Sequence, residues 1–324
     1  MSKNIHVTLA LPGLLWPHRE TFMSAINLPA LDKLRLWGRI QPQTTKRSKF
    51  YRQYLWHGSW LKLAKNQLGL KENHHCIIVV PISQSANLHE IHCISGKTLA
   101  LSPAEAENFC QILNHWFKNE GWRFHALQPD IWLLTTPEKL QFSAPSVLDL
   151  NDSMDSTTKP TGRDAQLLLK YQTEIQMLLH QHPLNQERCL QGTAPINAIW
   201  FEPDRIGSAT SNSLYTNCTW AHGAQQFPTD YNSFSAQLSN QCSIVLFAEE
   251  FCHPDIQNDR TAYEHLLQQW EQKWWKPLLT ALQNRKIQHL EINTDGPHGG
   301  LLHVCKPCIP PFWRKNRPFN GLML

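Results

Sequence analysis

One stretch of the chain, residues 162–207, constrains the fold most strongly. In its first half, side chains recur at spacings of three and four residues on one stripe, as in an amphipathic helix. The stripe consists of Leu168, Tyr171, Ile175, Leu178 and His182. Asp164 can cap the start of this helix, and Pro183 ends it because proline cannot donate the next backbone hydrogen bond. A polar segment and an apolar run at 198–201 follow, so we expect a donor-rich loop between a helix and a strand.

The polar side chains of this loop have the chemistry of an anion site. Arg188 carries five donors in a planar fork suited to phosphate or carboxylate, and Asn185 and Asn197 can each donate and accept. His182 could assist proton transfer or donate to an anion. Together they suit a phosphorylated ligand. The alternative is a purely structural network in which Asn and Arg satisfy the backbone of a buried loop, and both interpretations stay open here.

The run at 180–201, HQHPLNQERCLQGTAPINAIWF, resembles the signature of archaeal-type cofactor-independent phosphoglycerate mutases. Over most of its length the chain is also similar to a bacterial family of RpfE-type regulatory proteins, often labelled phosphoglycerate mutase by similarity. The further matching segments are PGLLWP (12–17), LPALDKL (28–34), the helix at 102–117, EIQMLLHQHPLN (174–185) and FWRKNRPF (312–319). Within these segments the ligand-binding candidates are His182, Asn185, Arg188, Asn197, Trp200 and Glu174.

The remaining pattern alternates strands and helices. Residues 5–11 and 287–295 read as strands, and 75–82 is an apolar run typical of a central strand. Ser102, Pro103 and Glu105 form a capping box with proline at the first helical position. A long helix is expected from residue 259, kinked or restarted at Pro277. An α/β fold with a mixed sheet flanked by helices follows.

The strand, glycine turn and helix near the N-terminus resemble the opening of the alkaline-phosphatase superfamily, to which the mutases belong. In that superfamily the first strand ends in an aspartate that ligates a catalytic metal, and Pro12 stands at this place. The ring of proline offers no lone pair to a cation, so the resemblance implies an alkaline-phosphatase-like sheet with a degenerate metal core. Thr44, Thr45 and Ser48 could stand for the mutase nucleophile, but they lie in a basic run that we interpret as a solvated loop. The catalytic residues stay unknown.

Two C-terminal segments hold weak metal candidates. Asp295 and His298 resemble the metal motif that closes the alkaline-phosphatase core, but two residues separate them where the motif has them adjacent. Cys305 and Cys308 form a C-x-x-C with His303 nearby, and a zinc site would need a fourth ligand. We expect no metal cofactor, and manganese or zinc is the alternative.

The length of 324 residues allows one elaborated domain or two. Composition becomes polar after Pro145, so we place a soft boundary between an N-terminal α/β part (1–150) and a part (151–324) with the mutase-like segment, both in one compact unit. The nine cysteines are odd in number and scattered, which suits reduced thiols. No run approaches the roughly 18 apolar residues of a membrane span. A cytoplasmic protein without membrane contact is expected.

Two hypotheses follow. The first is a non-catalytic binding or regulatory protein that senses a phosphorylated small molecule or binds a protein partner. Members of the resembling family are often encoded beside a single-strand DNA exonuclease, which suggests a partner in DNA metabolism. The net charge of +4 does not strongly indicate nucleic acid. The second is a metal-dependent, 2,3-bisphosphoglycerate-independent phosphoglycerate mutase or related phosphotransferase.

Overall fold

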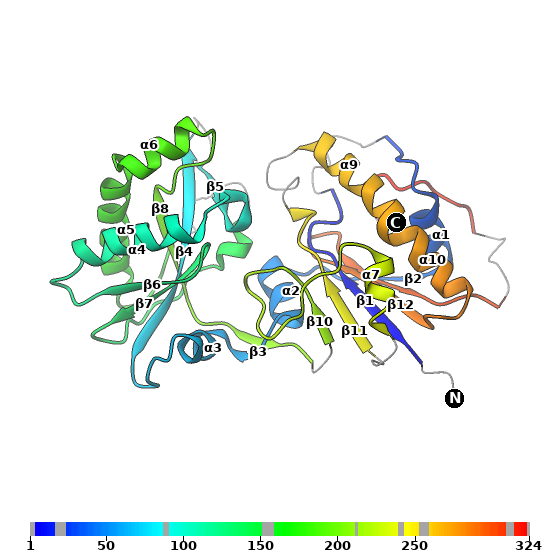
Figure 1. The fold of residues 1–324 in the computed structure, drawn as a ribbon, viewed down its shortest axis with the longest axis horizontal. Coiled ribbons are helices and arrows are strands. Elements are labelled where there is room, and N and C mark those ends of the chain that lie inside the picture. The colour runs from blue at the N-terminus through cyan, green and yellow to red at the C-terminus, as the bar shows by residue number, and fades with distance from the viewer. Residues whose placement is uncertain are drawn as a thin grey trace. The chain divides into compact units, whose positions relative to one another are not determined.

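The computed structural model of the protein describes residues 4–16, 24–86, 91–150, 159–210, 213–238, 243–252, 259–308 and 314–322. The chain forms two compact units, drawn in Figure 1. The first contains Met1–Trp56 and Ser208–Leu324, and the second is His57–Gly207. The second unit is therefore an insertion in the first.

This division differs from the single unit with a boundary near residue 150 that the sequence suggested. Residue 150 lies inside the second unit. The physical reason is strand pairing, because β7 (Ile131–Thr136) and β8 (Ala198–Glu202) both pair with β4 (His75–Ala86). The polar segment at 151–158 lies outside the described residues. The change to polar composition after Pro145 therefore falls inside the second unit and not at a boundary between units.

The first unit is built on a six-stranded mixed sheet. Its strands, in sheet order, are β10 (Ser213–Tyr215), β11 (Ser243–Phe247), β1 (His6–Ala10), β12 (His289–Thr294), β13 (Gly300–Val304) and β2 (Arg39–Pro42). The first four run parallel, and β13 is antiparallel to both of its neighbours. This is the mixed α/β sheet flanked by helices that the sequence predicts, with the expected strands at β1 and β12.

The two faces of this sheet differ in chemistry because successive side chains alternate. Val7, Leu9 and Ile292 point into a large apolar core shared with the helices. The helices of this core are α1 (Pro29–Trp37), α7 (Tyr231–Ser235), α9 (Arg260–Trp270) and α10 (Lys276–Gln283). On the other face, α2 (Arg47–Tyr54) packs Phe50 against Phe247 at a ring distance of 6.1 Å.

The basic run expected as a solvated loop is in part helix α2. Ser48 and Thr45 are buried, and Phe50 is 1% exposed. After α2 the chain continues into the short strand β3 (His57–Ser59) and α3 (Trp60–Gln67). Gly58 has φ +73° between the two helices, which interrupts a continuous helix.

The long C-terminal helix changes its winding just before Pro277, as expected. A π-helical turn, Glu271–Trp275, joins α9 to α10. Pro277 has no N–H to donate to the preceding turn, and a wider turn is one way to accommodate this loss. The turn directs the buried Glu271 at the start of α1, where its carboxylate accepts from Ala30 N at 2.6 Å and Leu31 N at 3.3 Å. Leu28, the N-cap residue of α1, has no side chain that can accept these hydrogen bonds. The carboxylate of Glu271 therefore caps α1 in its place.

Removing this cap should therefore destabilise the first unit. We expect Glu271→Ala to lower its free energy of unfolding by about 1–2 kcal/mol, the usual cost of losing a helix N-cap. Urea denaturation measures the change. The control is Glu264→Ala, because Glu264 makes only a half-exposed ion pair with Arg260 one turn away. Equal effects of the two substitutions would contradict the capping role.

The second unit has a sheet in the order β5 (Ile91–Ser95), β4, β7 and β6 (Arg123–Gln128), and β8 pairs with β4. The helices α4 (Pro103–Trp116) and α5 (Ala165–His180) contribute Phe109, Leu168 and Ile175 to a core with Val79 and Ile199. The predicted capping box is confirmed at the start of α4, where Ser102 accepts from Glu105 N and Glu105 accepts from Ser102 N. Among the described residues, no helix is long and apolar enough to cross a membrane.

Candidate functional site

The polar stretch after α5 is not the loop that the sequence suggested. Pro183 ends α5 as expected, but a second helix, α6 (Pro183–Leu190), starts at the same residue. Proline is favourable at the first helical position, because its missing N–H would have no partner there. His182 is the N-cap, and its Nδ1 accepts from Leu184 N at 3.2 Å. Asp164 occupies the N-cap of α5 without a side-chain cap and accepts instead from Gln141 N at 2.6 Å.

Asn185 is buried and its amide is fully engaged with backbone groups. Its Nδ2 donates to Leu179 O and Ile196 O, each at 2.8 Å, and its Oδ1 accepts from Ile196 N at 2.7 Å. These bonds join the end of α5 to the segment that leads into β8. An amide that makes three bonds of this kind fixes a buried turn.

Arg188 is 2% exposed and also turns inward. Its guanidinium donates from Nε to Ala194 O at 2.9 Å, from one terminal nitrogen to Glu105 Oε1 at 2.6 Å, and from the other to Leu99 O. The fork that could bind phosphate therefore binds a carboxylate and two carbonyls of the same unit. This geometry favours the structural interpretation for both Asn185 and Arg188.

The other candidate ligand-binding side chains do not join them at one point. Asn197 pairs with the backbone of Gln84 through two bonds of 2.7 Å. Trp200 donates to Pro145 O at 3.1 Å, and Glu174 makes an ion pair with Lys170 at 3.7 Å. Each of these side chains bonds to a different neighbouring segment. The polar residues of the motif therefore make contacts within the second unit.

The stability that the Arg188–Glu105 ion pair contributes should depend on pH, because Glu105 must be ionised. Burial raises the pKa of Glu105, but hydrogen bonds from Ser102 and the charged Arg188 outweigh burial and hold the pKa below its ordinary value of 4.5. An acid with a lowered folded pKa contributes stability above its unfolded pKa, and the contribution is lost as pH falls through the folded pKa.

We therefore expect Glu105→Gln to reduce the stability of the second unit at pH 7 by about 1–2 kcal/mol, as for hydrogen bonds to a charged group. The difference from the wild type should shrink as the pH falls below 4.5. Denaturant unfolding across this range measures it. The matched control is Glu107→Gln, an exposed change on the same helix. A constant difference at all pH values would contradict the ionised network.

In the first unit, functional groups gather where the parallel strands end. Asp295 follows β12 directly and is 5% exposed. Its Oδ1 accepts from Gly13 N at 2.8 Å, and its Oδ2 accepts from Arg47 Nε at 2.9 Å. Gly13 has φ +75°, and a Cβ there would lie 3.0 Å from the backbone of Phe251, so glycine permits this approach.

Beside this pair lies a second group of polar side chains from α2 and the end of β11. The hydroxyl of Tyr51 donates to Glu249 at 3.3 Å and lies 3.8 Å from the sulfur of Cys252. Burial raises the pKa of Tyr51 well above its usual value, so this phenol stays protonated. Cys252 in turn donates to Pro12 O at 3.4 Å, which ties the loop after β1 to the segment after β11.

Arg47 and Tyr51 are site residues that the sequence analysis missed. Arg47 comes from the basic run interpreted there as a solvated loop, and Tyr51 follows that run directly. No local spacing connects Arg47 with Asp295, since the two are 248 residues apart. The available signal was the basic run itself, just before a helix of aromatic residues.

The four weak metal candidates do not converge. Asp295 lies at the carboxyl end of β12, whereas Cys305 follows the antiparallel β13 and so lies at the opposite end. His298 is half-buried and Cys308 is exposed. Across the described ranges, no three His, Cys, Asp or Glu side chains are arranged to hold one metal ion.

Comparison with known proteins finds similar solved structures but no family. No family model matches the chain, and no curated protein matches it. Among solved structures, it is similar to the cofactor-independent phosphoglycerate mutase from Thermoplasma acidophilum DSM 1728, with 11% identity, TM-score 0.43, and coverage of 99% of this chain and 94% of that chain. It is also similar to the PH0037 protein from Pyrococcus horikoshii, with 12% identity, TM-score 0.46, and coverage of 94% and 88%. No activity is transferred to this chain from likenesses of this degree.

Proposed function

We propose that this chain is a non-catalytic binding or regulatory protein related in fold to the cofactor-independent phosphoglycerate mutases. One observation carries the proposal. Asp295 lies at the end of the central strand β12. One of its carboxylate oxygens accepts a hydrogen bond from Gly13 N, and the other accepts one from the guanidinium of Arg47. The charge that a catalytic cation would compensate is compensated by an arginine of the same unit.

The alternative, a metal-dependent mutase, would need two Mn²⁺ or Zn²⁺ ions held by several carboxylates and imidazoles at this edge. Pro12 offers none where the related superfamily has an aspartate. A guanidinium 2.9 Å from Asp295 Oδ2 repels a cation at the same oxygen. The residues present do not fit the metal pair.

For the ligand, we favour a protein partner over a phosphorylated small molecule. The guanidinium of Arg188 and the amide of Asn185, which could recognise phosphate, are used within the second unit. In contrast, Leu190 is 89% exposed at the end of α6 and Met177 is 71% exposed on α5. Both lie on consecutive helices of the second unit, and we propose this part of the unit as the contact surface. A partner in DNA metabolism is one such protein.

Isothermal titration of the full chain with Mn²⁺, in the presence and absence of 3-phosphoglycerate, tests the proposal. Mn²⁺ prefers oxygen ligands, so it reports on the Asp295 edge and not on thiols. We expect no saturable binding of the ion and none of 3-phosphoglycerate. Saturable Mn²⁺ binding by the wild type that is lost in Asp295→Asn, but retained in the matched Asp204→Asn change in the second unit, would overturn it.

A further inference from the structure

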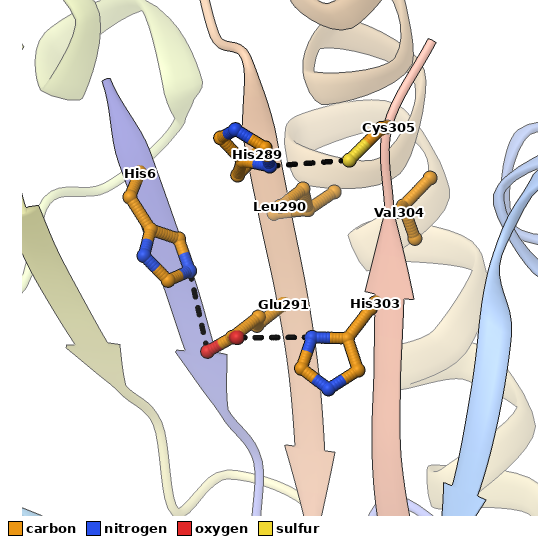
Figure 2. A pocket seen from close by; sticks show the side chains of 7 residues that line it. All are labelled: His6, His289, Leu290, Glu291, His303, Val304 and Cys305. Atoms are coloured by element: carbon orange, nitrogen blue, oxygen red, sulfur yellow. Dashed lines mark hydrogen bonds and ion pairs between the residues drawn. The ribbon is translucent and has the colours of Figure 1, made fainter. Parts of the chain in front are cut away.

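A row of histidine and cysteine side chains crosses the polar face of the first unit's sheet at the amino ends of β1 and β12. His6 is the register partner of His289 in the parallel pair. The pairing of Leu290 with Val304 places Cys305, the residue after β13, beside His289. Figure 2 shows the pocket that these residues line together with Glu291 and His303. It lies at the opposite end of the strands from Asp295.

The central pair of this row already has a chelating separation. His289 Nδ1 lies 3.1 Å from Cys305 Sγ, and both residues are exposed. In a tetrahedral zinc site, bond lengths of about 2.0 Å to nitrogen and about 2.3 Å to sulfur put the two ligand atoms about 3.5 Å apart. A change of less than half an ångström would therefore seat one ion between them.

The neighbouring residues supply further donors of the same kind. Cys308 follows Cys305 at the C-x-x-C spacing that chelates one tetrahedral ion. The ring of His6 lies 6.0 Å from that of His289, in an edge orientation. His6 Nε2 lies 3.3 Å from Glu291, whose other oxygen contacts His303 Nδ1 at 3.0 Å. A carboxylate on one ring nitrogen is the usual way to orient a histidine whose other nitrogen binds a metal.

We propose that Cys305, Cys308, His289 and His6 form a structural zinc site, in which Glu291 orients His6. Thiolate and imidazole ligands select a borderline ion such as Zn²⁺ over Mg²⁺ or Mn²⁺. Within the described residues no three such side chains yet surround one point, so Cys308 and His6 turn toward the central pair when the ion binds. The site supplies the partners that the isolated C-x-x-C motif lacked, and it is independent of the proposed function.

Cobalt substitution tests the site directly. The full chain, purified without a metal-affinity tag and kept reduced, is titrated with Co²⁺ while the thiolate-to-cobalt absorption is recorded. We expect one Co²⁺ per chain, displaced by Zn²⁺. Cys305→Ser and His289→Ala should weaken binding on the order of 100-fold or more, since even second-shell partners are worth 10–100-fold. Cys189→Ser and His180→Ala, exposed changes in the second unit, should leave it unchanged.

Two results would overturn the proposal. One is the absence of thiolate-to-cobalt absorption in the folded wild type. The other is binding that survives in Cys308→Ser with unchanged affinity, which would remove the C-x-x-C from the ligand set. Cys308 is exposed and lies beyond the end of β13, so this variant is expected to fold, and circular dichroism checks it.

Discussion

Replacing Arg188 by alanine is expected to lower the free energy of unfolding of the second unit by about 3 kcal/mol, the lower end of the cost of breaking a buried ion pair, because Arg188 is 2% exposed but Glu105 is 21% exposed. The substitution leaves Glu105 without its cation and removes the donors to Leu99 O and Ala194 O. Because Arg188 is 2% exposed, water does not readily replace these donors.

Denaturant unfolding gives the size of this effect, and hydrogen exchange with mass spectrometry places it in the second unit. The matched control is Arg163→Ala, because Arg163 also pairs with a carboxylate, at 3.1 Å, but its side chain is 62% exposed. Exposed pairs contribute about 0–1 kcal/mol. Similar effects of the two substitutions would contradict the buried network.

Replacing Trp270 by alanine is expected to cost the first unit about 3–5 kcal/mol, the usual range for a buried tryptophan. Trp270 is 2% exposed, and its indole packs against Trp274 and Trp275 at ring distances of 5.6 and 5.0 Å. Its Nε1 donates to Glu250 at 2.9 Å, so the truncation also leaves a carboxylate oxygen without this partner.

The matched control is Trp116→Ala at the end of α4, because Trp116 is 53% exposed. Exposed substitutions of this type usually change stability by less than about 0.5 kcal/mol. Hydrogen exchange should show that Trp270→Ala loosens the first unit and spares the core of the second. Loss of protection mainly in β4 and β7 would contradict the assignment of Trp270 to the core of the first unit.

The sequence predicted helix ends well where the interactions that set them are between residues close together in the chain. The capping box at Ser102 and Glu105 starts α4 as expected, because its two bonds involve neighbouring residues. Pro277 predicted a change in the last long helix, and the π-turn before it confirms this.

Partners far apart in the chain could not be predicted. The polar residues after α5 suggested a ligand site, but proline can start a helix as well as end one, and Pro183 does both. Which partner Arg188 meets depends on Glu105 and Leu99 in another element. The ion pair of Asp295 likewise depends on Arg47, which is far away in the sequence. The boundaries of the second unit depend on the pairing of β4 with β7 and β8.

The most direct test of the account is a search for mutase turnover. Phosphorus NMR of the full chain with 3-phosphoglycerate and millimolar Mn²⁺ would detect any 2-phosphoglycerate formed. With Asp295 bonded to Gly13 and Arg47, the account predicts no conversion. Conversion proportional to protein concentration, and abolished by Asp295→Asn, would contradict it and establish a working metal site at this edge.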